Sequence, residues 1–317
     1  MRGVHGPVLS ESLSRNERKR ELFGADTYFQ ESLDQLAELA ADPADFAYRH
    51  GLLLLKPDAV VSRQLLTTLD WLARSGFTVV AATKAPLTPT VVRSLWYFQW
   101  NLATAYRRRI ADLFTMTVPA LLLVIRKDGT DRPVSTLLTE LKGPTDPDRR
   151  RPGELRYELG KFSFLLNLVH TADEPADVIR ELGVHLDYAT RGEVLRQALD
   201  GVDNSPRARA LAEELHAAAP ARDLSFEPAA ARVRAQAARL AAELSGAARE
   251  ELTASLAVPG NDGLRALLGA AWRHGLALDP WDVTVVGSTV FPMKDKTFEP
   301  MIAAVTAADW QPAVAGR

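Results

Sequence analysis

The most constraining feature of the sequence is a series of short apolar runs separated by segments of helical spacing. Residues 51–55 form such a run, and it stops at Lys56-Pro57-Asp58. Because proline cannot donate to a β-ladder, this pattern predicts a buried strand that ends in a turn. The spacing of apolar and β-branched residues predicts three further strands, at 77–82, 119–126 and 162–169.

Segments with helical periodicity fill the intervals between these strands, at 62–75, 88–114, 132–141 and 174–185. The segment 88–114 has a possible division near Asn101. The resulting order β-α-β-α-β-α-β predicts an α/β fold, a ferredoxin-like α/β sandwich with helices on one face of an antiparallel sheet.

The flanking regions differ from this pattern. The first 20 residues are polar without a period and predict a mobile tail, whereas 27–43 has the spacing of a short amphipathic helix. Beyond about residue 190 the chain is alanine-rich and helical by spacing, and 282–291 suggests one more strand or an extended arm. We therefore divide the chain into an N-terminal extension (1–47), a central domain (48–190) and a mainly helical C-terminal extension (191–317).

Composition excludes several functional classes. The 38 basic and 40 acidic residues give a formal charge of −2, so no global positive field favours nucleic acid or an anionic membrane. The chain has no cysteine, which excludes disulfides, thiolate metal sites and cysteine nucleophiles. No apolar run is long enough to span a bilayer. We expect a cytoplasmic protein without membrane or nucleic-acid partners.

Four motifs in order carry a family resemblance. They are LLLLKPDAV at 52–60, GPTDPDRRRPGELR at 143–156, NLVH at 167–170 and DEPADVIREL at 173–182. Together they resemble the nucleoside diphosphate kinase family over about residues 48–190, and nothing familiar covers the two extensions. The resemblance implies a phosphotransferase that moves the terminal phosphate of a nucleoside triphosphate to a nucleoside diphosphate or related acceptor. Its partners would be these nucleotides, and a homo-oligomer is possible.

Under this resemblance His170 is the nucleophile that becomes a phosphohistidine, and a neutral imidazole suits that role near pH 7. It lies at the end of a predicted strand and before a helix whose N-terminal amides and dipole favour an anion. Glu181 matches the partner that fixes the histidine tautomer. Taken alone, a single histidine at a strand end is more often a packing or surface residue, and Glu181 is equally a solvated helix carboxylate.

Positioning of the phosphates needs cations, and the resemblance assigns this role to Lys56 and Arg156. It also places Thr145 and Asn167 where phosphate and sugar contacts are expected, although both residue types often stabilise turns or cap helices. A Mg²⁺ ion bound with the nucleotide is implied, with no dedicated protein ligands. The triplets Arg107-Arg108-Arg109 and Arg149-Arg150-Arg151 either clamp phosphates or form a solvated face.

The sequence departs from the family pattern around the nucleotide. Arg107, beside Tyr106, occupies the place of an aromatic residue that stacks on the base. The other departures are Thr139 in place of an arginine, Gln99 in place of a tyrosine, and Thr171-Ala172 in place of glycine and serine after the histidine. These changes suggest altered substrate preference, with Arg107 still a candidate nucleotide-binding residue.

Three functional hypotheses follow. The first is an active phosphotransferase, and the second is a degenerate nucleotide-binding regulatory or interaction protein without kinase activity. The third and weakest is a nucleic-acid-binding module, suggested only by the arginine triplets near Trp96, Tyr97 and Trp100. In the C-terminal extension, which could cap the site or contact a partner, Trp281 and Lys294 are the residues singled out.

Overall fold

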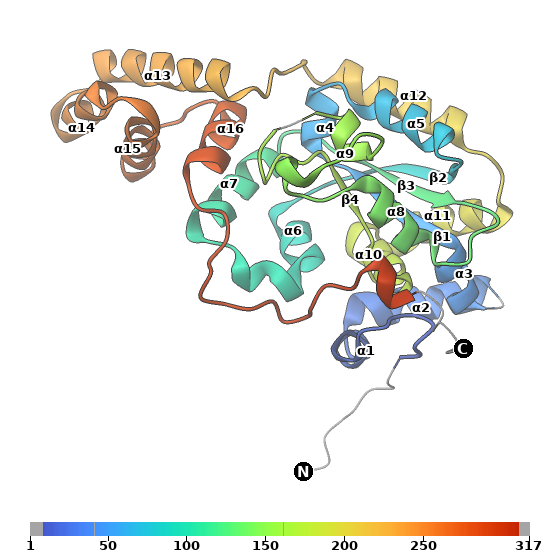
Figure 1. Cartoon of the computed structure of the whole chain (residues 1–317). Coiled ribbons are helices and arrows are strands. Elements are labelled where there is room, and N and C mark those ends of the chain that lie inside the picture. The colour runs from blue at the N-terminus through green and yellow to red at the C-terminus, as the bar shows by residue number, and fades with distance from the viewer. Residues whose placement is uncertain (1–8, 41, 161, 311–317) are drawn as a thin grey trace, which may run out of the picture.

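The computed structural model describes residues 9–40, 42–160 and 162–310. Its centre is a four-stranded antiparallel sheet with the spatial order β2-β3-β1-β4 (Figure 1). The strands are β1 (His50–Leu55), β2 (Thr78–Ala85), β3 (Ala120–Arg126) and β4 (Val169–Thr171). This order and polarity confirm the ferredoxin-like prediction.

Strand β1 is buried along its whole length because it lies inside the sheet, between β3 and β4. This explains its uninterrupted leucine run, since a strand covered on both faces needs apolar side chains in both directions. Leu53 pairs with Leu123 on one side and with Thr171 on the other.

The predicted strand at 162–169 is wrong for most of its length, since only Val169 belongs to β4. The backbone of Leu168 has φ 68°, a left-handed conformation that breaks an extended strand. Its amide donates to the carboxylate of Asp58 (2.9 Å), which holds this turn in place.

Helices cover both faces of the sheet, so the expectation of a single helical layer is wrong. One apolar core joins the odd-numbered leucines of β1 to three helices: α5 (Leu65–Arg74), α8 (Val134–Lys142) and α12 (Ser205–Ala218). The even-numbered leucines face a second core. Its helices are α10 (Pro175–His185), α2 (Thr27–Leu39), α3 (Pro43–Arg49) and α11 (Tyr188–Asp200).

The N-terminal segment is ordered where it is described, which contradicts a mobile tail over residues 9–20. Helix α1 (Glu17–Phe23) starts at Asn16, whose side chain accepts a hydrogen bond from the Lys19 amide. Residues 1–8 lie outside the described residues. The expected amphipathic helix at 27–43 is confirmed as α2, whose buried face includes Phe29 and Leu36.

Short elements connect the sheet to its helical layers. A helical hairpin between β2 and β3 consists of α6 (Pro89–Leu95), η1 (Tyr97–Leu102) and α7 (Ala105–Thr115), which confirms the predicted division near Asn101. The remaining short elements of the central domain are α4 (Pro57–Val61), η2 (Pro147–Arg149) and α9 (Leu155–Glu158).

The C-terminal extension is mainly helical, as predicted. Helices α13 (Phe226–Glu243), α14 (Gly246–Ala257) and α15 (Gly260–Arg273) project from the body of the molecule (Figure 1). The strand or arm expected at 282–291 is wrong, because α16 (Pro280–Val290) occupies it. Asp279 caps this helix and Pro280 starts it, and packing of α16 against α7 outweighs the strand preference of its valines.

After α16 the chain runs as an extended segment, residues 291–306, along the α6–α7 hairpin to η3 (Ala307–Trp310) beside α10 (Figure 1). We call residues 291–306 the C-terminal strap. It is held by backbone hydrogen bonds from Asp295 to Leu102 (2.8 Å) and from Met301 to Phe98 (3.0 Å).

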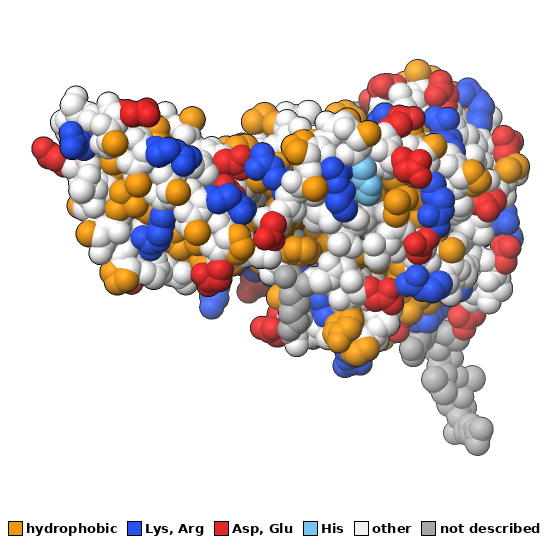
Figure 2. Space-filling view, turned by 90° about the horizontal axis from the view of Figure 1, so that it is seen from above, with side chains coloured by type: hydrophobic (Ala, Val, Ile, Leu, Met, Phe, Trp, Pro, Cys, Tyr) orange, Lys and Arg blue, Asp and Glu red, His pale blue; other side chains and the backbone are white. Residues whose placement is uncertain are grey.

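The described surface gives two further facts. None of the described helices is both long and apolar enough to cross a membrane. On the face seen in Figure 2, acidic and basic side chains are interspersed, so that face carries no extended basic patch.

Candidate active site

A cavity of about 320 Å³ is lined by all seven residues that the sequence assigned to catalysis or nucleotide binding. It lies between the α6–α7 hairpin, β4, α10 and the strap. The predicted residues on its wall are His170, Glu181, Lys56, Arg107, Thr145, Arg156 and Asn167. The volume is at the low end of the usual range for small-molecule sites.

His170 and Glu181 form the best-defined pair in this cavity. The Nε2 atom of His170 lies 3.0 Å from both carboxylate oxygens of Glu181. An ionised carboxylate only accepts hydrogen bonds, so Nε2 carries the proton that it donates. In the neutral ring Nδ1 is then unprotonated, with its lone pair free to attack.

The strand and helix that carry this pair explain its geometry. His170 pairs with Leu54 across β1 and β4, so both side chains lie on the sheet face that α10 covers. Trp96 contacts the imidazole edge to face, with 5.3 Å between ring centroids. The His170 side chain keeps 17% of its surface exposed, which leaves it accessible from the cavity.

Lys56 and Asp58 connect the first motif to the histidine motif. Lys56 is buried at the end of β1, where its Nζ donates to the Leu165 carbonyl (2.9 Å) and lies 3.4 Å from the Asp58 carboxylate. Burial lowers the pKa of Lys56, whereas Asp58 opposes this effect. The same carboxylate binds the Leu168 amide, so Asp58 positions the chain just before His170.

Arg156 holds the long loop against β4. Its guanidinium donates to the carbonyls of Gly143 (3.1 Å) and Val169 (2.8 Å) and to the Thr145 hydroxyl (3.2 Å). Burial lowers its pKa to about 10, and no carboxylate of the described chain forms an ion pair with it. Arg150 donates to four backbone carbonyls in this loop, in α9 and just after it, so it supports the loop's conformation.

Arg107 lines the cavity between two aromatic rings. Its guanidinium carbon lies 5.3 Å from the Trp100 ring centroid and 5.4 Å from that of Phe164. Burial lowers its pKa to about 10. Arg109 instead contacts Trp272, outside the cavity. The position where an aromatic residue was expected therefore presents a cation held by aromatic residues.

Sequence reasoning missed several cavity residues. Lys142, Asp173 and Lys19 line it, and the strap contributes Ile302–Val305. Lys294 also lines the cavity, whereas Trp281 is buried in the core against Phe114. The motif at 173–182 contained Asp173, but no periodicity in the sequence reveals that segments so distant in the chain meet.

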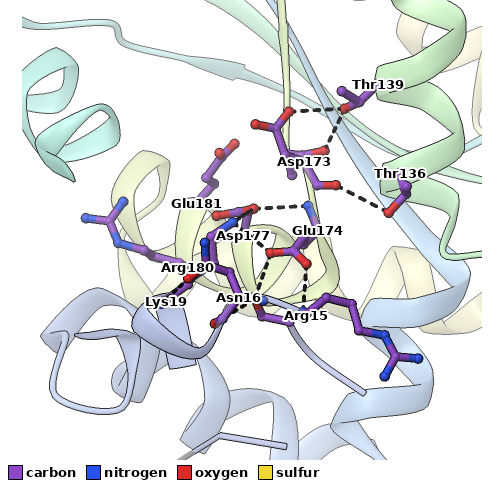
Figure 3. Close-up of polar contacts among 12 residues, drawn as sticks. Arg15, Asn16, Lys19, Thr136, Thr139, Asp173, Glu174, Asp177, Arg180 and Glu181 are labelled. Carbon is purple, nitrogen blue, oxygen red and sulfur yellow. Dashed lines mark hydrogen bonds and ion pairs between the residues drawn. The ribbon is translucent and has the colours of Figure 1, made fainter. Parts of the chain in front are cut away.

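The sequence led us to expect that the start of α10 favours a bound anion, and the anions found there are the Glu174 and Asp177 carboxylates of the helix's own capping box. The Ala176 amide donates to the Leu13 carbonyl (2.9 Å), and Glu174 donates its own amide to Asp177 (3.0 Å). Lys19 of α1 adds ion pairs to both carboxylates, at 2.9 and 2.7 Å (Figure 3). The N-terminal extension therefore already satisfies this helix end.

The cavity is strongly cationic. Among the described residues its wall carries seven lysine and arginine side chains and three carboxylates, besides His170. The cations are Lys19, Lys56, Arg107, Lys142, Arg156, Arg180 and Lys294, and the carboxylates are Asp173, Asp177 and Glu181. Such a cavity favours a polyanionic ligand.

The comparison with protein families identifies the central region. Residues 49–190 match the family model described as nucleoside diphosphate kinase. The central region belongs to the nucleoside diphosphate kinase family. A curated relative, a nucleoside diphosphate kinase of Methanocorpusculum labreanum, is 26% identical over 136 residues, which cover 43% of this chain and 86% of that protein.

Solved structures with a similar central region include an NDP kinase from Pyrobaculum aerophilum, with 19% identity and a TM-score of 0.38, over 44% of this chain and 97% of that one. A nucleoside diphosphate kinase from Borrelia burgdorferi, with bound vanadate and ADP, has 18% identity and the same TM-score, over 44% of this chain and 88% of that one.

The nucleoside diphosphate kinase-family domain thus contains the whole sheet and all seven predicted site residues. The cavity wall, however, extends beyond the family domain. Lys19 comes from the N-terminal extension, whereas Lys294 and Ile302–Val305 come from the C-terminal one. The extensions therefore take part in building the site.

Proposed function

We propose that this protein is an active phosphotransferase of the nucleoside diphosphate kinase type. It transfers the terminal phosphate of a nucleoside triphosphate to a nucleoside diphosphate or a related acceptor, through a phosphohistidine at His170. The observation that carries this proposal is the 3.0 Å contact between His170 Nε2 and the Glu181 carboxylate, in a cavity lined by cations.

In the first half-reaction Nδ1 attacks the terminal phosphorus. The N–P bond forms as the bond to the bridging oxygen breaks, and the nucleoside diphosphate leaves with that electron pair. Glu181 stabilises the positive charge that the ring acquires, because the Nε2 proton stays between the two groups. The second half-reaction reverses these steps with the acceptor's terminal oxygen as the nucleophile.

Lys56 and Arg156 are the proposed phosphate ligands, with Thr145 and Asn167 as hydrogen-bonding partners of phosphate and ribose. All four line the cavity. Arg107 is proposed to replace base stacking with a planar cation held between Trp100 and Phe164. This substitution would change the base preference without removing the phosphoryl chemistry.

The described residues contain no group of three or more histidine, cysteine, aspartate or glutamate side chains arranged to hold a metal ion. We propose that a Mg²⁺ ion would enter with the nucleotide, a binding mode that needs no dedicated set of protein ligands. Asp173 is the cavity carboxylate nearest in sequence to His170. We propose that it would contact the water molecules bound to the Mg²⁺ ion. When bound, the ion neutralises phosphate charge.

The test is labelling with ATP that carries radioactive phosphate in the terminal position. We expect an acid-labile, base-stable protein phosphate that unlabelled nucleoside diphosphate removes. His170→Ala should abolish the label. The control is His274→Ala, at the residue that follows α15, and this variant should still be labelled. Nucleotide binding by wild type without any labelling would reject the enzyme in favour of a degenerate nucleotide-binding protein.

The surroundings of this activity are also proposals. The absence of cysteine suits a reducing cytoplasm. The balanced charge of −2 argues against a nucleic-acid partner. A homo-oligomer remains part of the proposal, with the extensions altering the surfaces available to it.

A further inference from the structure

Lys142 is a buried cation of the cavity that neither the motifs nor the family resemblance points to. It is the last residue of α8 and is only 6% exposed. Its Nζ donates to the Thr171 hydroxyl, and no carboxylate among the described residues lies within ion-pair distance of it. An ammonium group has three donors, so this single contact leaves it poorly satisfied.

The position of Lys142 relative to His170 is the second observation. Thr171, which accepts its hydrogen bond, directly follows His170 in β4. Arg156 binds the carbonyl of Val169, the residue directly before His170 (2.8 Å). Two buried cations from α8 and α9 therefore contact the residues on either side of the nucleophile, and both line the cavity.

A purely structural role explains this lysine poorly. Burying an ammonium is costly unless a counter-charge compensates, and a neutral threonine hydroxyl does not supply one. The groups that act on Lys142 are Arg156 of α9, Asp173 before α10 and Glu181 of α10. Burial, together with Arg156, lowers the pKa of Lys142 to about 7, although the two carboxylates oppose this.

We propose that Lys142 is a phosphate-binding residue, whose ammonium holds an oxygen of the nucleotide's phosphate groups together with Arg156. This inference rests on the proposed function for the identity of the ligand. The bound phosphate is the counter-charge that the protein itself lacks. Binding then draws a proton onto Lys142 near neutral pH, because the anion stabilises the charged form.

The main variant is Lys142→Met, which keeps the length of the side chain and removes its charge. Titration calorimetry with Mg-ADP and with inorganic pyrophosphate should show roughly 10- to 100-fold weaker binding, the effect expected for one charge-assisted hydrogen bond. Without ligand, the variant should melt at the wild-type temperature or above it. Lys127→Met, a half-buried lysine that donates to the Ser75 carbonyl, is the matched control and should bind like wild type.

Wild-type affinity in folded Lys142→Met overturns the proposal, and so does a lowered melting temperature with unchanged affinity. If the variant does not fold, the proposal is tested on the wild-type protein. Calorimetry at pH 7 in buffers of different ionisation enthalpy should reveal proton uptake when pyrophosphate binds. Lys142→Arg, which stays charged, should lose that uptake. No uptake by wild type overturns the proposal.

The two proposals can fail separately. If ATP labels His170 while Lys142→Met binds normally, the phosphotransferase stands and the role of Lys142 falls. If pyrophosphate binding depends on Lys142 but His170 never becomes labelled, the phosphate site stands and the phosphotransferase falls.

Discussion

His170 and Glu181 are 11 residues apart in the chain, yet their side chains meet because α10 packs on the face of the sheet that carries His170. Two reactive groups of the cavity, His170 and Lys56, have a neighbour that acts on their proton or their charge. Glu181 fixes the proton on Nε2, and Asp58 lies beside Lys56. At the scale of the residue, function depends on these pairs more than on any single side chain.

Glu181→Gln should slow phosphorylation of His170 by about 10- to 100-fold, with little change in nucleotide affinity. The neutral amide supports the charged imidazole poorly, and its NH₂ group can donate to Nε2, which then leaves the proton on Nδ1. Rapid-quench measurement of label incorporation checks the rate, and titration calorimetry checks the affinity.

The control for this change is Glu158→Gln, whose carboxylate forms a partly exposed ion pair with Arg74 and lies outside the cavity. It should incorporate label at the wild-type rate. A Glu181→Gln protein that does the same would show that the carboxylate does not govern the nucleophile.

The effect of Lys142 on stability should depend on pH. Its folded pKa of about 7 lies below the ordinary value of 10.5, so between these values the unfolded chain binds this proton more tightly. The contribution of Lys142 to the free energy of unfolding therefore rises with pH across that window. Any stabilisation by Lys142→Met should be largest below pH 7 and should shrink towards pH 10.

Urea unfolding of wild type and Lys142→Met at pH 6, 8 and 10 measures this difference, with Lys127→Met treated in parallel. A difference between wild type and Lys142→Met that stays constant over the three values would contradict the lowered pKa.

At the scale of the element, the start of α10 is the junction that holds both extensions. Glu174, fully buried, accepts hydrogen bonds from the Ser14 hydroxyl (2.7 Å), the Arg15 amide (2.9 Å) and the Trp310 indole (3.0 Å). Figure 3 shows the Lys19 side chain at this helix end, whereas the Arg15 side chain points away from it and only the Arg15 backbone amide contacts Glu174. The helix that carries Glu181 is therefore fixed by residues outside the family domain.

Glu174→Ala should lower the free energy of unfolding by about 3 to 5 kcal/mol, because it leaves the buried Lys19 with one carboxylate fewer and several donors unpaired. Chemical denaturation measures the loss. The control Glu214→Ala removes an exposed ion pair with Lys84 and should cost less than about 1 kcal/mol. Equal effects of the two changes would show that Glu174 is not a junction.

At the scale of the whole molecule, the apolar core crosses the boundaries of the family domain. Leu53 and Leu123 of the sheet share one core with Leu215 of α12 and with Trp281 of α16, which is 5% exposed. The opposite face of the sheet is covered partly by Phe29 of the N-terminal extension. The extensions thus complete the fold as well as the cavity.

A fragment of residues 48–190 should therefore fail to unfold cooperatively or should aggregate, because removing the extensions exposes apolar surface on both faces of the sheet. Circular dichroism melting of the fragment and of the full chain tests this. A fragment with a sharp transition near the full-chain melting temperature would show that the extensions are independent additions.

Local pattern was enough to predict most of the central fold. The leucine run of β1, the proline at its end and the helical spacing of α5 and α10 are properties of neighbouring residues, and each predicted its element. Six of the seven candidate site residues belong to the four motifs, whose order and spacing singled them out, whereas Arg107 was singled out by a departure from the family pattern. Prediction was poorer where long-range packing outweighs local preference, as in the valine-rich α16 and in the turn at Leu168.

The sequence by itself indicated the alternation of strands and helices along the central domain and the identity of the proposed nucleophile, since the first follows from apolar periodicity and the second from the four motifs. Only the tertiary structure decided that the N-terminal segment holds α10, that the strap closes one side of the cavity, and that Lys142 points into it without a carboxylate. The physical reason is that burial and charge pairing are properties of residues far apart in the chain. A local sequence pattern therefore cannot contain them, because they arise only when the chain folds.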